Sequence, residues 1–91
     1  MAGTITFGMD IELVRQLATE MRTAAEQAQD ILTRITGKLQ ATPWEGADRQ
    51  KFQGEWEGPH TAALTQVVNG LTQAADIATQ NAAQQEQASG N

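Results

Sequence analysis

Apolar residues recur every three or four positions along two long stretches of this chain, which indicates two amphipathic helices. In the first stretch these positions run from Val14 to Ile35, and in the second from Phe52 to Ala78. This spacing keeps side chains on one face of an α-helix. Such a wide apolar face is typical of a helix that contacts two neighbours in a bundle. Further apolar positions at steps of seven widen the face in both stretches: Ala18, Ala25, Leu32 and Leu39, then Val68, Ala75 and Ala82.

Local signals place a turn near the middle of the chain. Asp10 is a suitable N-cap for the first helix, which we expect over about residues 10–41. Thr42-Pro43-Trp44-Glu45-Gly46 follows, so the turn is assigned to about residues 42–46. The second helix is expected over about residues 47–85. Both ends of the chain are expected to be flexible, and the Gln- and Ala-rich C-terminal end should fray because it has little apolar bulk.

Two further signals concern the start and the regularity of the second helix. Thr42-Pro43-Trp44-Glu45 has the form of a capping box, with Thr at the N-cap and Pro at the first helical position. That motif allows the helix to begin as early as Pro43. Gly58-Pro59 is a rival turn, but a turn there would leave one long arm and one short arm. Gly54, Gly58 and Pro59 are therefore interpreted as a kink or loosened turn inside the second helix.

These elements predict one all-α domain over residues 1–91, folded as an antiparallel helix-turn-helix hairpin. In a hairpin of this size each helix keeps an apolar stripe that its single neighbour does not cover, so a partner is expected. Folding the chain back at Trp44 would bring residues equally distant from it to similar heights, for example Ala24 and Leu64. The residues expected in the hairpin or dimer core are Val14, Leu17, Met21, Ile31, Ile35, Phe52, Trp56, Leu64, Val67 and Leu71.

Composition and charge exclude several classes of function. The net charge is -5, and all six Lys and Arg residues fall between Arg15 and Lys51. There is therefore no basic face for nucleic acid and no basic helix for an anionic membrane. The chain has no Cys and no Tyr, and His60 alone is a poor basis for a metal site. No cluster of nucleophile and base can be drawn, so we expect no enzymatic activity and no cofactor.

The turn sequence and the residues after it resemble the Trp-X-Gly (WXG) family of small substrates of the type VII, or ESX, secretion system. Trp44-x-Gly46 is followed by Asp48, Phe52 and Trp56 in the pattern W-x-G-x-D-x-x-x-F-x-x-x-W. Gly8-Met9-Asp10, and Asn81-Ala82 with Gln84-Gln85, are similar to an actinobacterial branch of the family. The resemblance covers most of the chain.

This resemblance implies a hairpin that pairs with itself or with a sibling WXG-type protein to give a four-helix bundle. It also implies a protein made in the cytoplasm and secreted in folded form, although the N-terminal residues have no basic and apolar segments of the kind found in a cleaved signal peptide. In the family, the turn Trp and Gly lie beside the C-terminal end of the partner. A Tyr-x-x-x-Asp/Glu motif there completes an export signal that the secretion ATPase reads.

This chain departs from the family pattern because it has no Tyr. The residue four positions before Glu86 is Ala82, and the residue four before Asp76 is Thr72. We therefore predict a heterodimer in which Trp44 and Gly46 are the export-signal and partner-binding residues and the sibling carries the C-terminal motif. A homodimer is the alternative.

Other interpretations stay open at this stage. Trp44 can instead be a loop tryptophan packed on its own hairpin, and His60 a packed imidazole or a pH sensor. Two other functions are considered: an intracellular, chaperone-like adaptor for a larger type VII toxin, and a membrane-active helical protein. The absence of basic residues after Lys51 argues against strong binding to anionic lipid.

Overall fold

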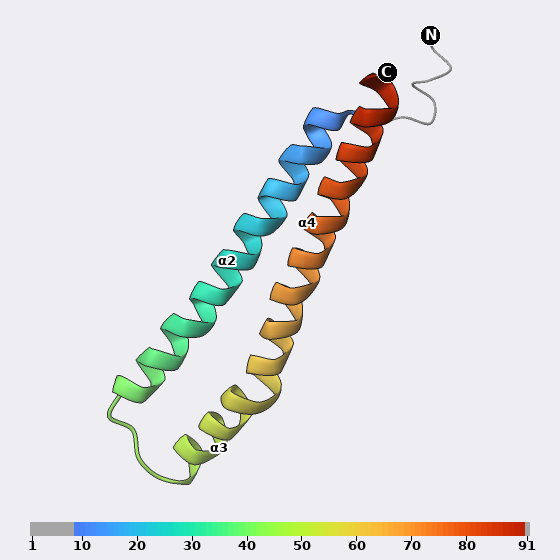
Figure 1. Cartoon of the computed structure of the whole chain (residues 1–91). Coiled ribbons are helices and arrows are strands. Elements are labelled where there is room, and N and C mark those ends of the chain that lie inside the picture. Colours follow the sequence, from blue (N-terminus) through green and yellow to red (C-terminus); the bar gives the residue numbers. More distant parts are fainter. Residues whose placement is uncertain (1–8, 91) are drawn as a thin grey trace.

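The computed structural model describes residues 9–90, which form one long helix and a second, bent helical arm (Figure 1). The long helix is α2, Ile11–Ala41. The second arm consists of α3, Ala47–Glu55, a π-helix η1, Trp56–His60, and α4, Thr61–Gly90. No strand occurs within residues 9–90, so the predicted all-α class is confirmed. Gly8 and the N-terminal end that was expected to be flexible lie outside the described residues.

Helix α2 begins and ends where the local sequence signals place it. The Oδ1 atom of Asp10 accepts a hydrogen bond from the Leu13 amide at 3.1 Å, as expected for an N-cap. Glu12 lies in the first turn and Lys38 in the last, which suits the helix dipole at both ends. The expected range of about 10–41 is confirmed to within one residue.

Thr42 ends α2 and does not cap the second arm. Its hydroxyl donates to the carbonyl oxygen of Lys38 at 2.6 Å, and its amide donates to the carbonyl oxygen of Leu39. The hydroxyl is thus turned back toward α2, and residues 43–45 are not helical. The helix start at Pro43, inferred from the capping box, is wrong. The start assigned near residue 47 is confirmed, because α3 begins at Ala47 after Gly46.

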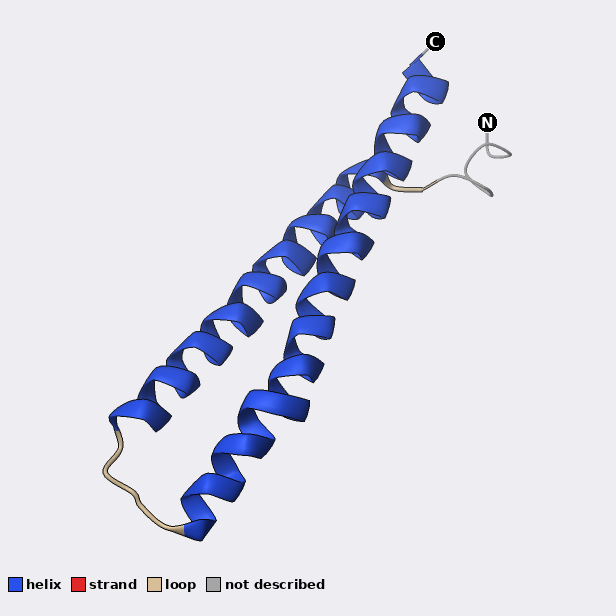
Figure 2. Cartoon of the chain, turned by 60° about the horizontal axis from the view of Figure 1, so that its bottom comes forward, coloured by secondary structure: helices blue, strands red, loops and turns tan. Residues whose placement is uncertain are grey.

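Helices α2 and α4 lie side by side and run in opposite directions (Figures 1 and 2). Their contact is made by the residues at steps of seven, most of which are alanines. Small side chains here allow two helices to approach closely. The bulkier residues at steps of three and four consequently lie beside the contact and not within it. The buried residues of the described chain are Ala18, Ala25, Leu39, Ala75 and Ala82.

The residues that lie opposite each other on the two arms differ from those expected for a fold-back at Trp44. Arg22 contacts Asp76, whereas a fold-back at Trp44 would place it level with Gln66, about three helical turns away. The reason is the path of the connection, which runs on along the rod, so α3 begins beyond the end of α2 (Figure 1). The expected pairing of Ala24 with Leu64 is therefore wrong.

The second arm bends at the Gly- and Pro-containing segment, as predicted. Pro59 lies inside η1, and the amide of Thr61 donates to the carbonyl oxygen of Trp56, five residues earlier. The Thr61 hydroxyl donates to the same oxygen at 2.6 Å. The expected kink is thus a π-helical turn.

Helix α4 continues to Gly90, beyond the expected end near residue 85. Gln and Ala are good helix formers, and Glu86 makes an ion pair with Arg15 of α2, with Nη2 and Oε1 2.7 Å apart. The helix end assigned near residue 85 is therefore too early. The Arg15 guanidinium holds the pKa of Glu86 below its ordinary value, first by hydrogen bonding and then by Coulomb attraction.

The Arg15–Glu86 pair should make stability depend on pH. The pKa of Glu86 is lower in the folded chain than in the unfolded chain, so the pair stabilises the fold above the unfolded-state pKa. That contribution is lost as pH falls through the folded-state pKa. We expect Glu86→Gln to lower the melting temperature near neutral pH and to have no effect at a pH of about 2, where both forms are neutral. Thermal unfolding followed by circular dichroism measures this.

Glu20→Gln is the matched control, because Glu20 is an exposed carboxylate of α2 for which the structure shows no ion pair. Added salt should reduce the effect of Glu86→Gln, since both partners are exposed. An equal loss of stability at neutral and acidic pH would contradict a role for the charge of Glu86.

Candidate functional site

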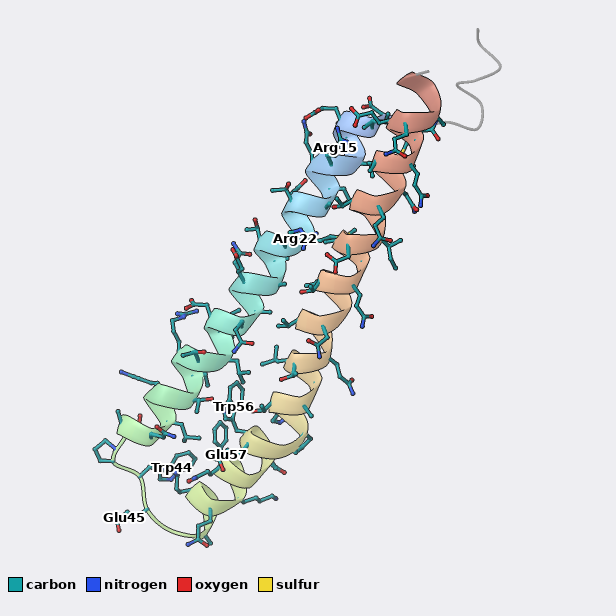
Figure 3. The ribbon with its side chains drawn as sticks, viewed as in Figure 1. Arg15, Arg22, Trp44, Glu45, Trp56 and Glu57 are labelled. Carbon is teal, nitrogen blue, oxygen red and sulfur yellow. The ribbon has the colours of Figure 1, made fainter. Side chains whose placement is uncertain are left out.

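Trp44 and Phe52 form an aromatic pair at the turn end of the rod, here called the turn patch. Their ring centroids are 5.6 Å apart and the ring planes are tilted by 50°. The pair is far from buried, with Trp44 37% exposed and Phe52 43% exposed. Trp44 is turned toward the second arm, whereas Glu45 points away from it (Figure 3). Trp44 therefore packs on its own chain and still presents apolar surface to solvent.

Arg49 fixes the connection beneath the turn patch. Its Nη1 atom donates to the carbonyl oxygen of Trp44 at 3.0 Å and, at 3.4 Å, to that of Thr42. Its Nε atom donates to Oε1 of Gln53 at 3.1 Å. Arg49 was not among the site residues predicted from the sequence. Helical periodicity carries no signal for it, because its partners are carbonyl groups of an irregular segment.

Gly46 has a backbone conformation that only glycine adopts readily. Its φ is 116° and its ψ is -175°, which lie in a region closed to residues with a Cβ atom. A Cβ atom built at Gly46 would meet nothing within 4 Å, so the requirement is conformational and does not come from packing. The carbonyl oxygen of Gly46 also accepts the Gln50 amide in the first turn of α3. Gly46 thus reverses the chain and starts the second arm.

Trp56 has a different environment from Trp44. Its Nε1 atom donates to Oγ1 of Thr36 on α2 at 2.9 Å, and both residues are half-buried. Its other ring neighbour is His60, with centroids 6.3 Å apart. Trp56 thus joins the two arms, whereas Trp44 packs on Phe52 and stays partly exposed. Thr36 was not predicted, because a lone Thr in a helix does not reveal a partner on another element.

None of the ten residues predicted for a hairpin or dimer core is buried in the single chain. Five are half-buried: Val14, Met21, Trp56, Leu64 and Leu71. The other five are exposed: Leu17, Ile31, Ile35, Phe52 and Val67. Leu13 and Ile77, which were not predicted, are also exposed. The single chain therefore leaves these apolar side chains outside a closed core.

Five of the exposed apolar residues lie on one side of the helix pair. Arg15–Glu86 and Arg22–Asp76 bridge α2 and α4 and so define one flank of the contact. On α2, Leu17 and Ile35 lie about 100° around the helix from Ala18, in the opposite sense from Arg22. On α4, Val67 lies about 80° from Ala75, in the opposite sense from Asp76. The second flank, here called the apolar flank, comprises Leu13, Leu17, Ile31, Ile35 and Val67, whereas Ile77 lies about 160° from Ala75, on the outer face of α4.

The described residues show no site for metal chemistry. Within residues 9–90 there is no group of three or more His, Asp or Glu side chains placed to hold a metal ion. Over the same residues, no helix has both the length and the apolarity needed to cross a membrane. The features that stand out are thus two surfaces, the turn patch and the apolar flank.

We expect Gly46→Ala to lower the free energy of unfolding by about 1–3 kcal/mol, because alanine is strained at this φ and ψ. Gly37→Ala is the matched control. It lies within α2, its Cβ atom would also meet nothing within 4 Å, and it should stabilise the helix by up to about 1 kcal/mol. Urea denaturation of both variants measures the difference. Equal effects of the two substitutions would refute a special conformation at Gly46.

Comparisons of the chain with protein-family models, with curated proteins and with solved structures found no match.

Proposed function

We propose that this chain is a non-enzymatic, secreted substrate or adaptor of a type VII (ESX) secretion system and acts as one subunit of a dimer of helical hairpins. The observation that carries the proposal is the turn patch. The Trp-x-Gly sequence lies at the turn end of two antiparallel helices, Gly46 has a glycine-only conformation, and Trp44 is 37% exposed. An indole held in place and partly exposed is suited to recognition.

The dimer is supported by the apolar flank. Its residues come from both α2 and α4 and lie on one side of the pair, which leaves an apolar surface that runs along the rod. Large exposed apolar surfaces on small proteins mark interaction sites. A second hairpin laid on this flank would complete a four-helix bundle, in which each helix has two neighbours. The partner would be a sibling WXG-type protein.

The heterodimer is favoured over the homodimer by the absence of Tyr from this chain. Trp44 and Gly46 supply one half of the export signal, and the C-terminal end of the sibling supplies the other. The secretion ATPase would then bind a surface that exists only in the assembled dimer. With such a signal, only the assembled dimer would be recognised for export.

The function is tested by export from a strain that produces the chain and its sibling together. We expect Trp44→Ala to abolish export while the dimer still forms, since Trp44 lies at the turn and outside the apolar flank. Trp56→Phe is the control, because it alters the other tryptophan and keeps an apolar ring against α2. Immunoblots of culture filtrate and cell pellet measure export.

Two outcomes of the export experiment would reject parts of the proposal. Normal export of Trp44→Ala would remove the export-signal role. Normal export of the wild-type chain from a strain lacking every sibling hairpin would remove the heterodimer. Retention of the wild-type chain inside the cell, bound to a larger substrate, would favour the intracellular adaptor.

The apolar flank makes a separate prediction about association. Leu17→Ala should weaken the dimer by about 1.5–3 kcal/mol, or roughly 10- to 150-fold in dissociation constant, because a buried leucine would be lost from the interface. Thr19→Ala is the control, since Thr19 is exposed and lies on the ion-paired side of α2. Sedimentation equilibrium with and without the sibling measures both. A wild-type chain that stays monomeric in both conditions would disprove the dimer.

A further inference from the structure

The π-helical turn η1 is the feature of the fold that the proposed function leaves unexplained. It interrupts the second arm between α3 and α4 and begins at Trp56, the residue that contacts α2. Single π-turns inside α-helices are rare and occur frequently at functional sites. The extra residue in this turn changes the direction of the side chains that precede it.

A π-turn holds one residue more than an α-turn, so it rotates the preceding helix by about 100° relative to an unbroken helix. If α4 continued unbroken through residue 56, Trp56 would lie about 100° from the direction of Ala75, on the side of Val67. That side is the apolar flank. With the extra residue, Trp56 points at α2 instead, where its Nε1 atom donates to Thr36.

The same rotation brings Phe52 to the connection. In an unbroken helix Phe52 would lie about 140° from the direction of Ala75, on the outer side of the arm. The extra residue reduces this angle to about 40°. Phe52 then lies one helical turn nearer the turn end than Trp56, and Trp44 of the connection packs on it. One inserted residue therefore places both aromatic side chains of α3 and η1.

Pro59 explains why the chain forms a π-turn here. Proline has no N–H to donate and its ring clashes with the carbonyl group four residues earlier, here that of Glu55. A wider turn relieves the clash. The carbonyl oxygen of Trp56 then accepts from both the amide and the hydroxyl of Thr61, so the widened turn keeps its hydrogen bonds.

We propose that Pro59, through the π-turn, is a positioning residue for the turn patch. It holds Phe52 under Trp44 at the turn end and keeps the Trp56 indole off the apolar flank, where the partner hairpin would bind. The part of this proposal that concerns export rests on the proposed function. The part that concerns side-chain geometry does not.

The geometry is tested by NMR on the purified full-length chain with Pro59→Ala, which restores the N–H and removes the ring. We expect the nuclear Overhauser effect (NOE) cross-peaks between Trp44 and Phe52, and between the Trp56 indole N–H and Thr36, to disappear as the turn becomes α-helical. Gly70→Ala in α4 is the control for a change in helix propensity, because its Cβ atom would meet nothing within 4 Å, and it should keep both sets of cross-peaks. Persistence of both sets in Pro59→Ala would overturn the proposal.

A second variant keeps the test decisive if Pro59→Ala is poorly folded by circular dichroism. Thr36→Val removes the acceptor of the Trp56 indole and leaves the π-turn in place. It should shift the Trp56 indole signal and preserve the Trp44–Phe52 cross-peaks. Loss of the Trp44–Phe52 cross-peaks in Thr36→Val would show that Thr36, and not the π-turn, places the turn patch, and would overturn the proposal.

The export arm uses the same variants in the strain that also produces the sibling. Pro59→Ala should reduce export toward the level of Trp44→Ala, and Gly70→Ala should leave it unchanged. Unchanged export of Pro59→Ala, in a chain that has lost its Trp44–Phe52 cross-peaks, would overturn the positioning role in export. Normal export of Trp44→Ala instead rejects the proposed function, and the NMR comparison still decides whether Pro59 places the patch.

Discussion

The close contact of two helices through small side chains is the constraint on which the rest of this structure depends. Ala75 and Ala82 are fully buried, and Ala18 and Ala25 nearly so, whereas no large side chain among the described residues is completely enclosed. Alanines give little apolar area but let the helix backbones approach. Five of the exposed bulky residues lie on one flank, and two ion pairs bridge the other. The chain thus has a contact between its helices made mostly of alanines, and an apolar flank beside that contact.

The two tryptophans show how a repeated sequence acquires two roles. Trp-Glu-Gly occurs at residues 44–46 and again at residues 56–58, but only the first lies in an irregular connection. Gly46 adopts a positive φ there, while Gly58 lies inside the π-helix. The first tryptophan is left partly exposed on Phe52, and the second is tied to Thr36. The difference comes from the backbone around each tryptophan and not from the motif.

Those features that depend on neighbouring residues in the chain were predictable. The Asp10 cap, the end of α2 at Ala41 and the irregularity at Pro59 all follow from local rules and are all present. The capping box at Thr42 was the local signal that failed. The Thr42 hydroxyl could bond either to a backbone amide after it, as in a capping box, or to a backbone carbonyl before it. In the structure it donates to the carbonyl oxygen of Lys38.

The sequence by itself determined the helical class, the position of the connection and the two sets of apolar positions, because periodicity, proline and glycine act over a few residues. Only the tertiary structure decided which set meets the other helix, which residues of the two arms are level, and where Arg49 and Thr36 find their partners. The reason is that both sets of apolar positions lie on the same wide face. The path of residues 42–46 and the rotation at Trp56–His60 select between them, and neither can be read from spacing alone.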